Sequence, residues 1–116
     1  MNFKFSANPA SWDPSITVIR LNGSIDSTMA PEFEQQALAV VASGKPRVIL
    51  DCADLDFISS AGIGVLMVIL GAVERAGGFL KVMNAPEDIY ESFDMLGITE
   101  IIEFLKNEKE GSQARA

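Results

Sequence analysis

The organisation of this chain follows from residues 47–78, which read RVILDCADLDFISSAGIGVLMVILGAVERAGG. The run Val48–Leu50 is apolar, rich in β-branched residues and closed by Asp51, a pattern typical of a strand covered on both faces. No charged residue occurs from Ala61 to Val73, a segment too long for a strand, so it is predicted to be a buried helix. A turn after Asp51 and a short strand ahead of the helix are expected to connect the two.

Two serines, Ser59 and Ser60, stand just before the predicted helix. A serine hydroxyl at this place accepts a hydrogen bond from a free N–H group of the first helical turn, so the helix is expected to start within a residue or two of Ser60. The simplest interpretation is that one serine is only a helix cap. The same place collects free N–H donors and the positive end of the helix dipole, so it also suits an anion such as a phosphate.

The remaining segments predict strands and helices in alternation. Alternating or continuous apolar runs indicate strands, whereas capping residues followed by apolar residues at spacings of three and four indicate helices. Strands are expected at 3–6, 16–26, 79–83 and 101–105, helices at 27–42 and 84–96, and a loop at 8–15. This order predicts an α/β domain in which helices cover a mixed sheet.

The composition excludes several function classes. The chain has 116 residues and a formal net charge of −7, so one domain is expected, and neither nucleic acid nor a membrane surface is an expected partner. It has no His and a single Cys, which excludes a His general base, a Cys–His pair and a zinc site built from these residues. No cofactor is indicated, and no enzymatic activity is expected. No secretory signal is visible, so a cytoplasmic location is expected.

Four aspartates stand near predicted strand ends, namely Asp26, Asp51, Asp54 and Asp56. Carboxylates gathered at one sheet edge can hold a divalent cation or accept a phosphoryl group. Solvated turn formers at strand ends have the same sequence pattern, and this interpretation is preferred. No metal site is therefore predicted.

Residues 48–64 resemble the STAS domain of bacterial anti-sigma-factor antagonists. Three further segments share the resemblance: LNGSID at 21–26, the Gly pair at 77–78 and FDMLG at 93–97. The family motif around its phosphorylated serine reads approximately Asp-Ser-Ser/Thr-Gly-Leu-Gly, and it aligns with SSAGIG at 59–64. Ser60 takes the phosphorylated position, Ser59 replaces the family Asp and is an alternative acceptor, and Ala61 replaces the second hydroxyl residue.

The resemblance implies a single STAS-like domain over residues 1–106, with a mixed β-sheet of about five strands covered by about three to four helices. Residues 107–116 are polar and are expected to form a frayed tail. The partner-binding residues implied are Asp26, Ser59, Ser60, Ala61, Gly62 and Gly64.

The resemblance also implies partner switching controlled by phosphorylation. The unphosphorylated domain would bind a GHKL-type anti-sigma-factor serine kinase, the kinase would phosphorylate Ser60, and a PP2C-type phosphatase would reverse the modification. Two alternatives stay open: a constitutive STAS subunit of a transporter or signalling scaffold, and a receiver-like domain phosphorylated on Asp51. The receiver-like alternative lacks an acidic pair after the first strand. The oligomeric state, the identity of the kinase and the final target are left open by the sequence.

Overall fold

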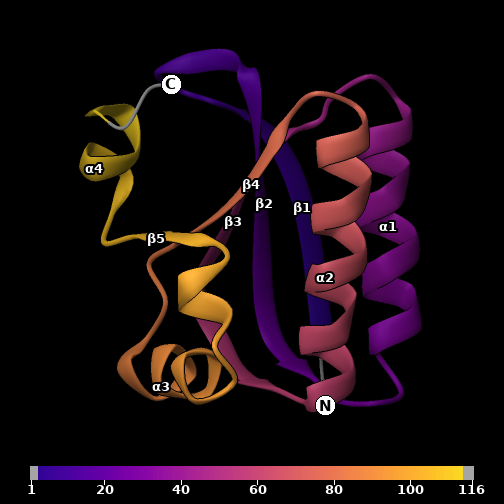
Figure 1. The fold of residues 1–116 in the computed structure, drawn as a ribbon, viewed down its shortest axis with the longest axis vertical. Coiled ribbons are helices and arrows are strands. Elements are labelled where there is room, and N and C mark those ends of the chain that lie inside the picture. The colour runs from indigo at the N-terminus through magenta and orange to yellow at the C-terminus, as the bar shows by residue number, and fades with distance from the viewer. Residues whose placement is uncertain (1–2, 114–116) are drawn as a thin grey trace.

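The computed structural model describes residues 3–113, which form one five-stranded sheet with helices packed against it (Figure 1). The strands are β1 (Phe3–Ala10), β2 (Asp13–Ile25), β3 (Arg47–Ile58), β4 (Phe79–Met83) and β5 (Glu103–Leu105). The helices are α1 (Ala30–Ala42), α2 (Ser60–Arg75), α3 (Glu87–Met95), the 3₁₀ turn η1 (Ile98–Glu100) and α4 (Glu108–Gln113).

The sheet is mixed, as the sequence predicts. Its strands lie in the order β1-β2-β3-β4-β5, with β1 antiparallel to β2 and every other pair parallel. Helices α1 and α2 lie side by side along the sheet, and α3 lies near the end where α2 begins (Figure 1). The prediction of an α/β domain with about five strands and three to four helices is confirmed.

The main core lies between the sheet and the helices. Its fully buried members include Ile19 of β2, Leu50 of β3, Phe33 of α1, Leu66 of α2 and Phe93 of α3. Every major element therefore contributes an apolar side chain to one cluster, and burial of this area is the main favourable term in folding. The predicted apolar helix α2 belongs to this core.

The expected break after Asp51 is wrong, because β3 runs without interruption to Ile58. Asp51 is 3% exposed and its carboxylate has three donors. The Ala53 N–H and the Asn84 side-chain amide both donate to Oδ1 at 3.1 Å, and Arg20 Nε lies 3.3 Å from Oδ2. A buried carboxylate with these partners is compatible with the interior of a strand, so the chain continues.

The register of β3 against β2 shifts just after Asp51. Arg20 pairs with Asp51, but the next recorded pair is Asn22 with Asp54, so β3 contains one more residue than β2 over this interval. An extra residue of this kind is a β-bulge, which bends the strand and increases its twist. The sequence predicts a turn here because the bulge places polar residues at positions that break the regular alternation of apolar and polar residues in a strand.

The long loop predicted between the first two strands is also wrong. β1 continues to Ala10 and β2 begins at Asp13, which leaves Ser11 and Trp12 as the connection. Pro9 lies inside β1, where it pairs with Thr17. An edge strand accepts a proline because one side of its backbone has no neighbouring strand.

Within the segment expected to fray, the structure has helix α4 at 108–113. Glu108 accepts a hydrogen bond from the Ser11 hydroxyl at 2.7 Å, so α4 is joined to the β1–β2 turn. Residues 114–116 lie outside the described residues. The division into a domain up to residue 106 and a frayed tail stays a prediction.

No helix within residues 3–113 combines the length and apolar character needed to cross a membrane.

Candidate functional site

The candidate site lies at the sheet edge where β2 and β3 end together. Ile25 pairs with Ile58, and the Ser59 N–H donates to the Ile25 carbonyl at 2.8 Å. Asp26 follows one strand and the two serines follow the other, so the sheet register brings them to the same edge. The structure therefore brings together the serine pair and Asp26, which the sequence associates only by resemblance.

Ser59 is the cap of α2. Its backbone is extended, with φ −79° and ψ 168°, and its side-chain oxygen accepts a hydrogen bond from the Gly62 N–H at 3.1 Å. The side chain is half-buried. The predicted helix start near Ser60 is confirmed, and the capping role belongs to Ser59.

Ser60 is the first residue of α2 and is exposed. Its neighbour on the exposed side, Ala61, adds only a methyl group. Since Ser59 already serves as the cap, the Ser60 hydroxyl is the accessible one of the pair. Ser60 belongs to the first turn of α2, where free N–H groups and the positive end of the helix dipole favour a negative charge.

The two glycines of the motif have different surroundings. Gly62 is buried, and a Cβ atom there would lie 2.7 Å from Cγ1 of Ile58 and 3.0 Å from Cγ2 of Ile25. It therefore lets α2 pack closely over the strand ends. Gly64 is exposed, and a Cβ atom there would meet nothing within 4 Å. Of the two predicted partner-binding glycines, only Gly64 presents a surface.

Asp26 holds the turn between β2 and α1. Its Oδ1 accepts hydrogen bonds from the Thr28 hydroxyl at 2.6 Å, the Thr28 N–H at 2.9 Å and the Met29 N–H at 3.0 Å. These bonds favour the ionised carboxylate, with the Thr28 hydroxyl as the largest cause, and they lower the pKa of Asp26 below its ordinary value of 3.8. A negative charge is therefore fixed beside the serine pair.

A shallow groove between α1 and α2 adjoins this edge. Its volume is about 520 Å³ and it is lined by Ser27, Ala30, Pro31, Glu34, Gln35, Ala61 and Val65. Sequence reasoning missed the α1 residues as site residues, because only the packing of α1 on α2 places them beside Ala61. Their sole signal in the sequence is a helix that begins soon after Asp26.

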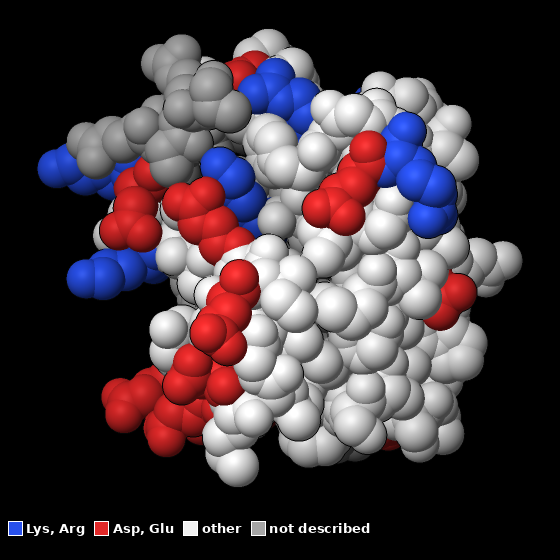
Figure 2. Space-filling model, viewed as in Figure 1, with Lys and Arg blue, Asp and Glu red and all other residues white. Residues whose placement is uncertain are grey.

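The outer face of α2 continues the site as an uncharged surface. Exposed residues recur along it at Ser60, Ala61, Gly64 and Val68, and all are uncharged. Figure 2 shows this face of the molecule largely white over α2, with charged side chains gathered toward its other end and toward the side of α3. We call the exposed α2 residues together with the groove the switch surface.

The other acidic residues do not form a site with it. Asp54 and Asp56 are exposed, and among the described residues no group of three or more His, Cys, Asp or Glu side chains could hold a metal ion. Asp51 lies inside β3 with its carboxylate occupied by three donors, which counts against a receiver-like phosphorylation site. Burial raises the pKa of Cys52 to about 12, so its thiol stays protonated and unreactive.

Comparison with known proteins identifies the family. The STAS domain family model matches residues 10–111. BtrV of Bordetella bronchiseptica, named as a candidate anti-sigma factor antagonist, is 31% identical over 94 residues, covering 81% of this chain and 80% of that relative. The anti-sigma-B factor antagonist of Bacillus subtilis is 28% identical over 96 residues, covering 82% of this chain and 86% of that relative.

The fold also agrees with a solved structure. The crystal structure of an anti-sigma factor antagonist from Mycobacterium paratuberculosis superposes with a TM-score of 0.85 at 20% sequence identity, covering 99% of this chain and 96% of that one. At 20% sequence identity, this agreement shows similarity of fold alone. Together with the family match over residues 10–111, it shows that this chain belongs to the STAS domain family.

Proposed function

We propose that this protein is an anti-sigma-factor antagonist whose binding is switched by phosphorylation of Ser60. The names of its relatives in Bordetella bronchiseptica and Bacillus subtilis support the first part of the proposal. The second part is carried by one observation, which is the exposed Ser60 hydroxyl in the first turn of α2. The neighbouring Ser59 hydroxyl is held by the cap, so the two serines are not equivalent.

A phosphoryl group on Ser60 would change the switch surface and leave the fold in place. It adds about −1.5 to −2 charges at pH 7, next to free N–H groups that stabilise an anion. The same charge would lie near Asp26, whose lowered pKa keeps it ionised. An uncharged or acidic partner surface would then meet concentrated negative charge, and its binding would weaken.

The partner in the unphosphorylated state would be a GHKL-type anti-sigma-factor serine kinase. The kinase would bind the switch surface and release the sigma factor or other target it holds. It would transfer the γ-phosphoryl group of ATP to Ser60 Oγ, and a PP2C-type phosphatase would hydrolyse the ester. The chain has no His to act as a general base, so the kinase must accept the hydroxyl proton. The protein is then a substrate and ligand, not a catalyst.

Phosphorylation by the cognate kinase and ATP tests this proposal. The wild type and Ser59→Ala should each gain one phosphate on Ser60, whereas Ser60→Ala should gain none and still bind the kinase. Ser60→Asp should bind weakly because it carries a negative charge at the switch surface. Fragmentation mass spectrometry of the tryptic peptide that contains both serines locates the phosphate. Phosphate recovered on Ser59, with Ser60 unmodified, would overturn the assignment.

A matched pair of charge substitutions tests the binding surface. Val68→Glu places a carboxylate on the exposed face of α2 and should weaken kinase binding about tenfold or more. Ala39→Glu adds the same charge on an exposed position of α1 outside the groove, and should leave binding unchanged. Equal affinities of the two variants, measured by titration calorimetry, would exclude this face of α2 as the contact.

The chemical stability of the phosphate separates the alternatives. An ester on serine survives acid, whereas an acyl phosphate on Asp51 is lost. Intact mass of the protein from native cells, with and without phosphatase treatment, tests whether the modification occurs there. A protein that is never phosphorylated would support a constitutive STAS interaction subunit.

A further inference from the structure

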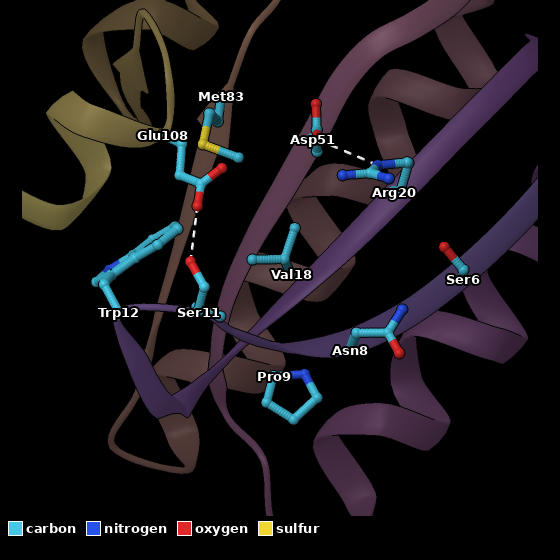
Figure 3. Close-up of a pocket in the computed structure, with 11 residues that line it drawn as sticks. Ser6, Asn8, Pro9, Ser11, Trp12, Val18, Arg20, Asp51, Met83 and Glu108 are labelled. Atoms are coloured by element: carbon cyan, nitrogen blue, oxygen red, sulfur yellow. Dashed lines mark hydrogen bonds and ion pairs between the residues drawn. The ribbon is translucent and has the colours of Figure 1, made fainter.

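A second hollow lies on the sheet face opposite α1 and α2, away from the switch surface (Figure 3). Its volume is about 290 Å³, close to the lower end of the roughly 300–1,000 Å³ typical of small-molecule sites. The β1–β2 hairpin, β3, β4 and α4 all contribute to its wall. Its lining residues are Ser6, Asn8, Pro9, Ala10, Ser11, Trp12, Val18, Arg20, Asp51, Met83 and Glu108.

The polar end of the hollow is a guanidinium group held in place by a buried carboxylate. Arg20 Nε lies 3.3 Å from Asp51 Oδ2, and Asp51 is itself fixed by Ala53 and Asn84. The Arg20 side chain is 61% exposed, and its two terminal nitrogens have no hydrogen-bond partner among the described residues. A fork of N–H donors that is oriented in advance and unoccupied is the arrangement that binds a carboxylate well.

The rest of the hollow adds hydrogen-bonding groups and an apolar wall. Ser6 is the register partner of Arg20 on β1, and Asn8 lies two residues further along the same strand face. Val18, Met83 and Trp12 supply apolar and aromatic surface (Figure 3). Polar groups therefore lie at both ends of the hollow, Arg20 at one and the Ser11–Glu108 pair at the other, and Val18 lies between them (Figure 3). A ligand with one anionic group and an apolar body fits this arrangement.

The surrounding charges restrict the ligand further. The lining has one cation, Arg20, and two acids, Asp51 and Glu108, and Lys4 lies beside Arg20 at a neighbouring hollow of about 300 Å³. Glu108 lies across the second hollow from Arg20, and its carboxylate accepts a hydrogen bond from the Ser11 hydroxyl (Figure 3). A second negative group on the ligand would therefore be repelled.

We propose that this hollow binds a small organic monoanion, a carboxylate that bears a flat apolar group. The carboxylate would accept hydrogen bonds from the terminal nitrogens of Arg20, and the apolar group would lie against Val18, Met83 and Trp12. This binding site is separate from the switch surface and does not depend on Ser60.

Nuclear magnetic resonance titration with benzoate tests the proposal. The chain contains a single Trp, so the indole N–H signal of Trp12 reports on the hollow without ambiguity. Benzoate should produce saturable shifts of this signal and of the Ser6 and Asn8 amides. Benzamide, which has the same shape without the charge, and terephthalate, which carries a second carboxylate, should each bind about tenfold more weakly or worse.

Three variants show whether the hollow is responsible. Arg20→Gln should weaken benzoate binding about tenfold or more, whereas Arg75→Gln removes the same charge at the end of α2 and should have no effect. Val18→Phe keeps the Arg20–Asp51 pair and should abolish binding by filling the hollow, so the test does not depend on the stability of Arg20→Gln. The proposal is overturned if benzoate gives no saturable shift, if benzamide binds equally well, or if Val18→Phe binds as the wild type does.

Discussion

At the residue scale, the two adjacent serines differ in what their hydroxyl groups do. Ser59 accepts the Gly62 N–H and is half-buried, whereas Ser60 is exposed and one residue into the helix. A cap hydroxyl replaces water at an otherwise unsatisfied N–H group, so its loss is felt in stability. A hydroxyl at the first helical position does not cap the helix and is available to a partner.

The two serines should therefore differ in how much their substitution by alanine lowers the free energy of unfolding. Ser59→Ala is expected to lower the free energy of unfolding by about 1 kcal/mol, because the Gly62 N–H loses its acceptor. Ser60→Ala should change it by less than about 0.5 kcal/mol, as is usual for an exposed site. Urea titrations followed by circular dichroism measure both values. Equal losses for the two variants would contradict the assignment of the cap.

Asp26 should make stability depend on pH in the acidic range. Its folded-state pKa is lowered below 3.8, so its contribution is fully present above the unfolded-state pKa and is lost as the pH falls through the folded-state pKa. Asp26→Asn keeps an acceptor and removes the titration. The wild type should therefore exceed this variant in stability at pH 7, and the difference should shrink below pH 3.8.

Denaturant unfolding at a series of pH values checks this expectation. Asp54→Asn serves as the control, since Asp54 is an exposed acid within the neighbouring strand β3. A stability difference between wild type and Asp26→Asn that stays constant from neutral to acidic pH would show that the hydrogen bonds to Thr28 and Met29 do not favour the ionised form.

At the scale of elements, β3 and the start of α2 determine the geometry of the switch surface and of the second hollow. β3 is a single strand with two register shifts against β2, and it carries Asp51 on one sheet face while leading to Ser59 at its end. α2 then starts directly over the strand ends because Gly62 permits close packing. The polar anchor of the second hollow and the exposed hydroxyl of the switch surface thus depend on one continuous segment.

Loss of the Asp51 carboxylate should destabilise this segment. Asp51→Ala removes the acceptor for Ala53, Asn84 and Arg20, and we expect the free energy of unfolding to fall by about 2–3 kcal/mol. Asp54→Ala, on an exposed position of the same strand, should change it by no more than about 0.5 kcal/mol. The midpoints of urea unfolding measure the difference, provided that the dependence of the unfolding free energy on urea concentration is the same for both variants. Indistinguishable midpoints would show that the bulge does not need the carboxylate.

The two glycines at the start of α2 should respond to alanine in opposite directions. Gly62→Ala forces a methyl group against Ile58 and Ile25 and should destabilise the protein by about 1–2 kcal/mol. Gly64→Ala meets open space and should stabilise it by about 0.5–1 kcal/mol through helix propensity. Thermal unfolding of the two variants in parallel gives the signs. A stabilising effect of Gly62→Ala would mean that the strand ends accommodate the methyl group.

At the scale of the whole molecule, the switch surface and the second hollow lie on opposite faces of one sheet. The switch surface belongs to the face covered by α1 and α2, and the second hollow belongs to the face partly closed by α4 and the β1–β2 turn. The main core separates them. A charge added at Ser60 can therefore alter one face without rearranging the other.

Phosphorylation of Ser60 should consequently change binding far more than stability. The free energies of unfolding of the phosphorylated and unphosphorylated proteins should agree within about 1 kcal/mol, because a helix N-terminus stabilises the added charge by about this amount or less. Kinase affinity should fall about tenfold or more over the same modification. Urea unfolding and calorimetry on the same two samples provide the comparison, and a phosphoprotein that unfolds far more easily would indicate a switch through the fold.

Much of the fold, and the serine pair of the candidate site, could be predicted from local sequence patterns. The capped start of α2, the buried strand at Val48–Leu50 and the mixed sheet follow from hydroxyl caps, β-branched runs and the order of the elements. The break at Asp51 and the long loop before Asp13 were predicted wrongly, because a polar residue in a bulge and a proline in an edge strand give the same local pattern as a turn.

What the sequence determined by itself was the placement of a serine pair at the start of an apolar helix, since capping depends on residues only a few positions apart. Only the tertiary structure decided that Ser59 is held while Ser60 is exposed, that Asp26 lies at the same edge, and that Arg20 is fixed by Asp51 beside Trp12. The reason is that these relations depend on strand register and helix packing. They join residues distant in the chain, for which a single sequence carries no periodic signal.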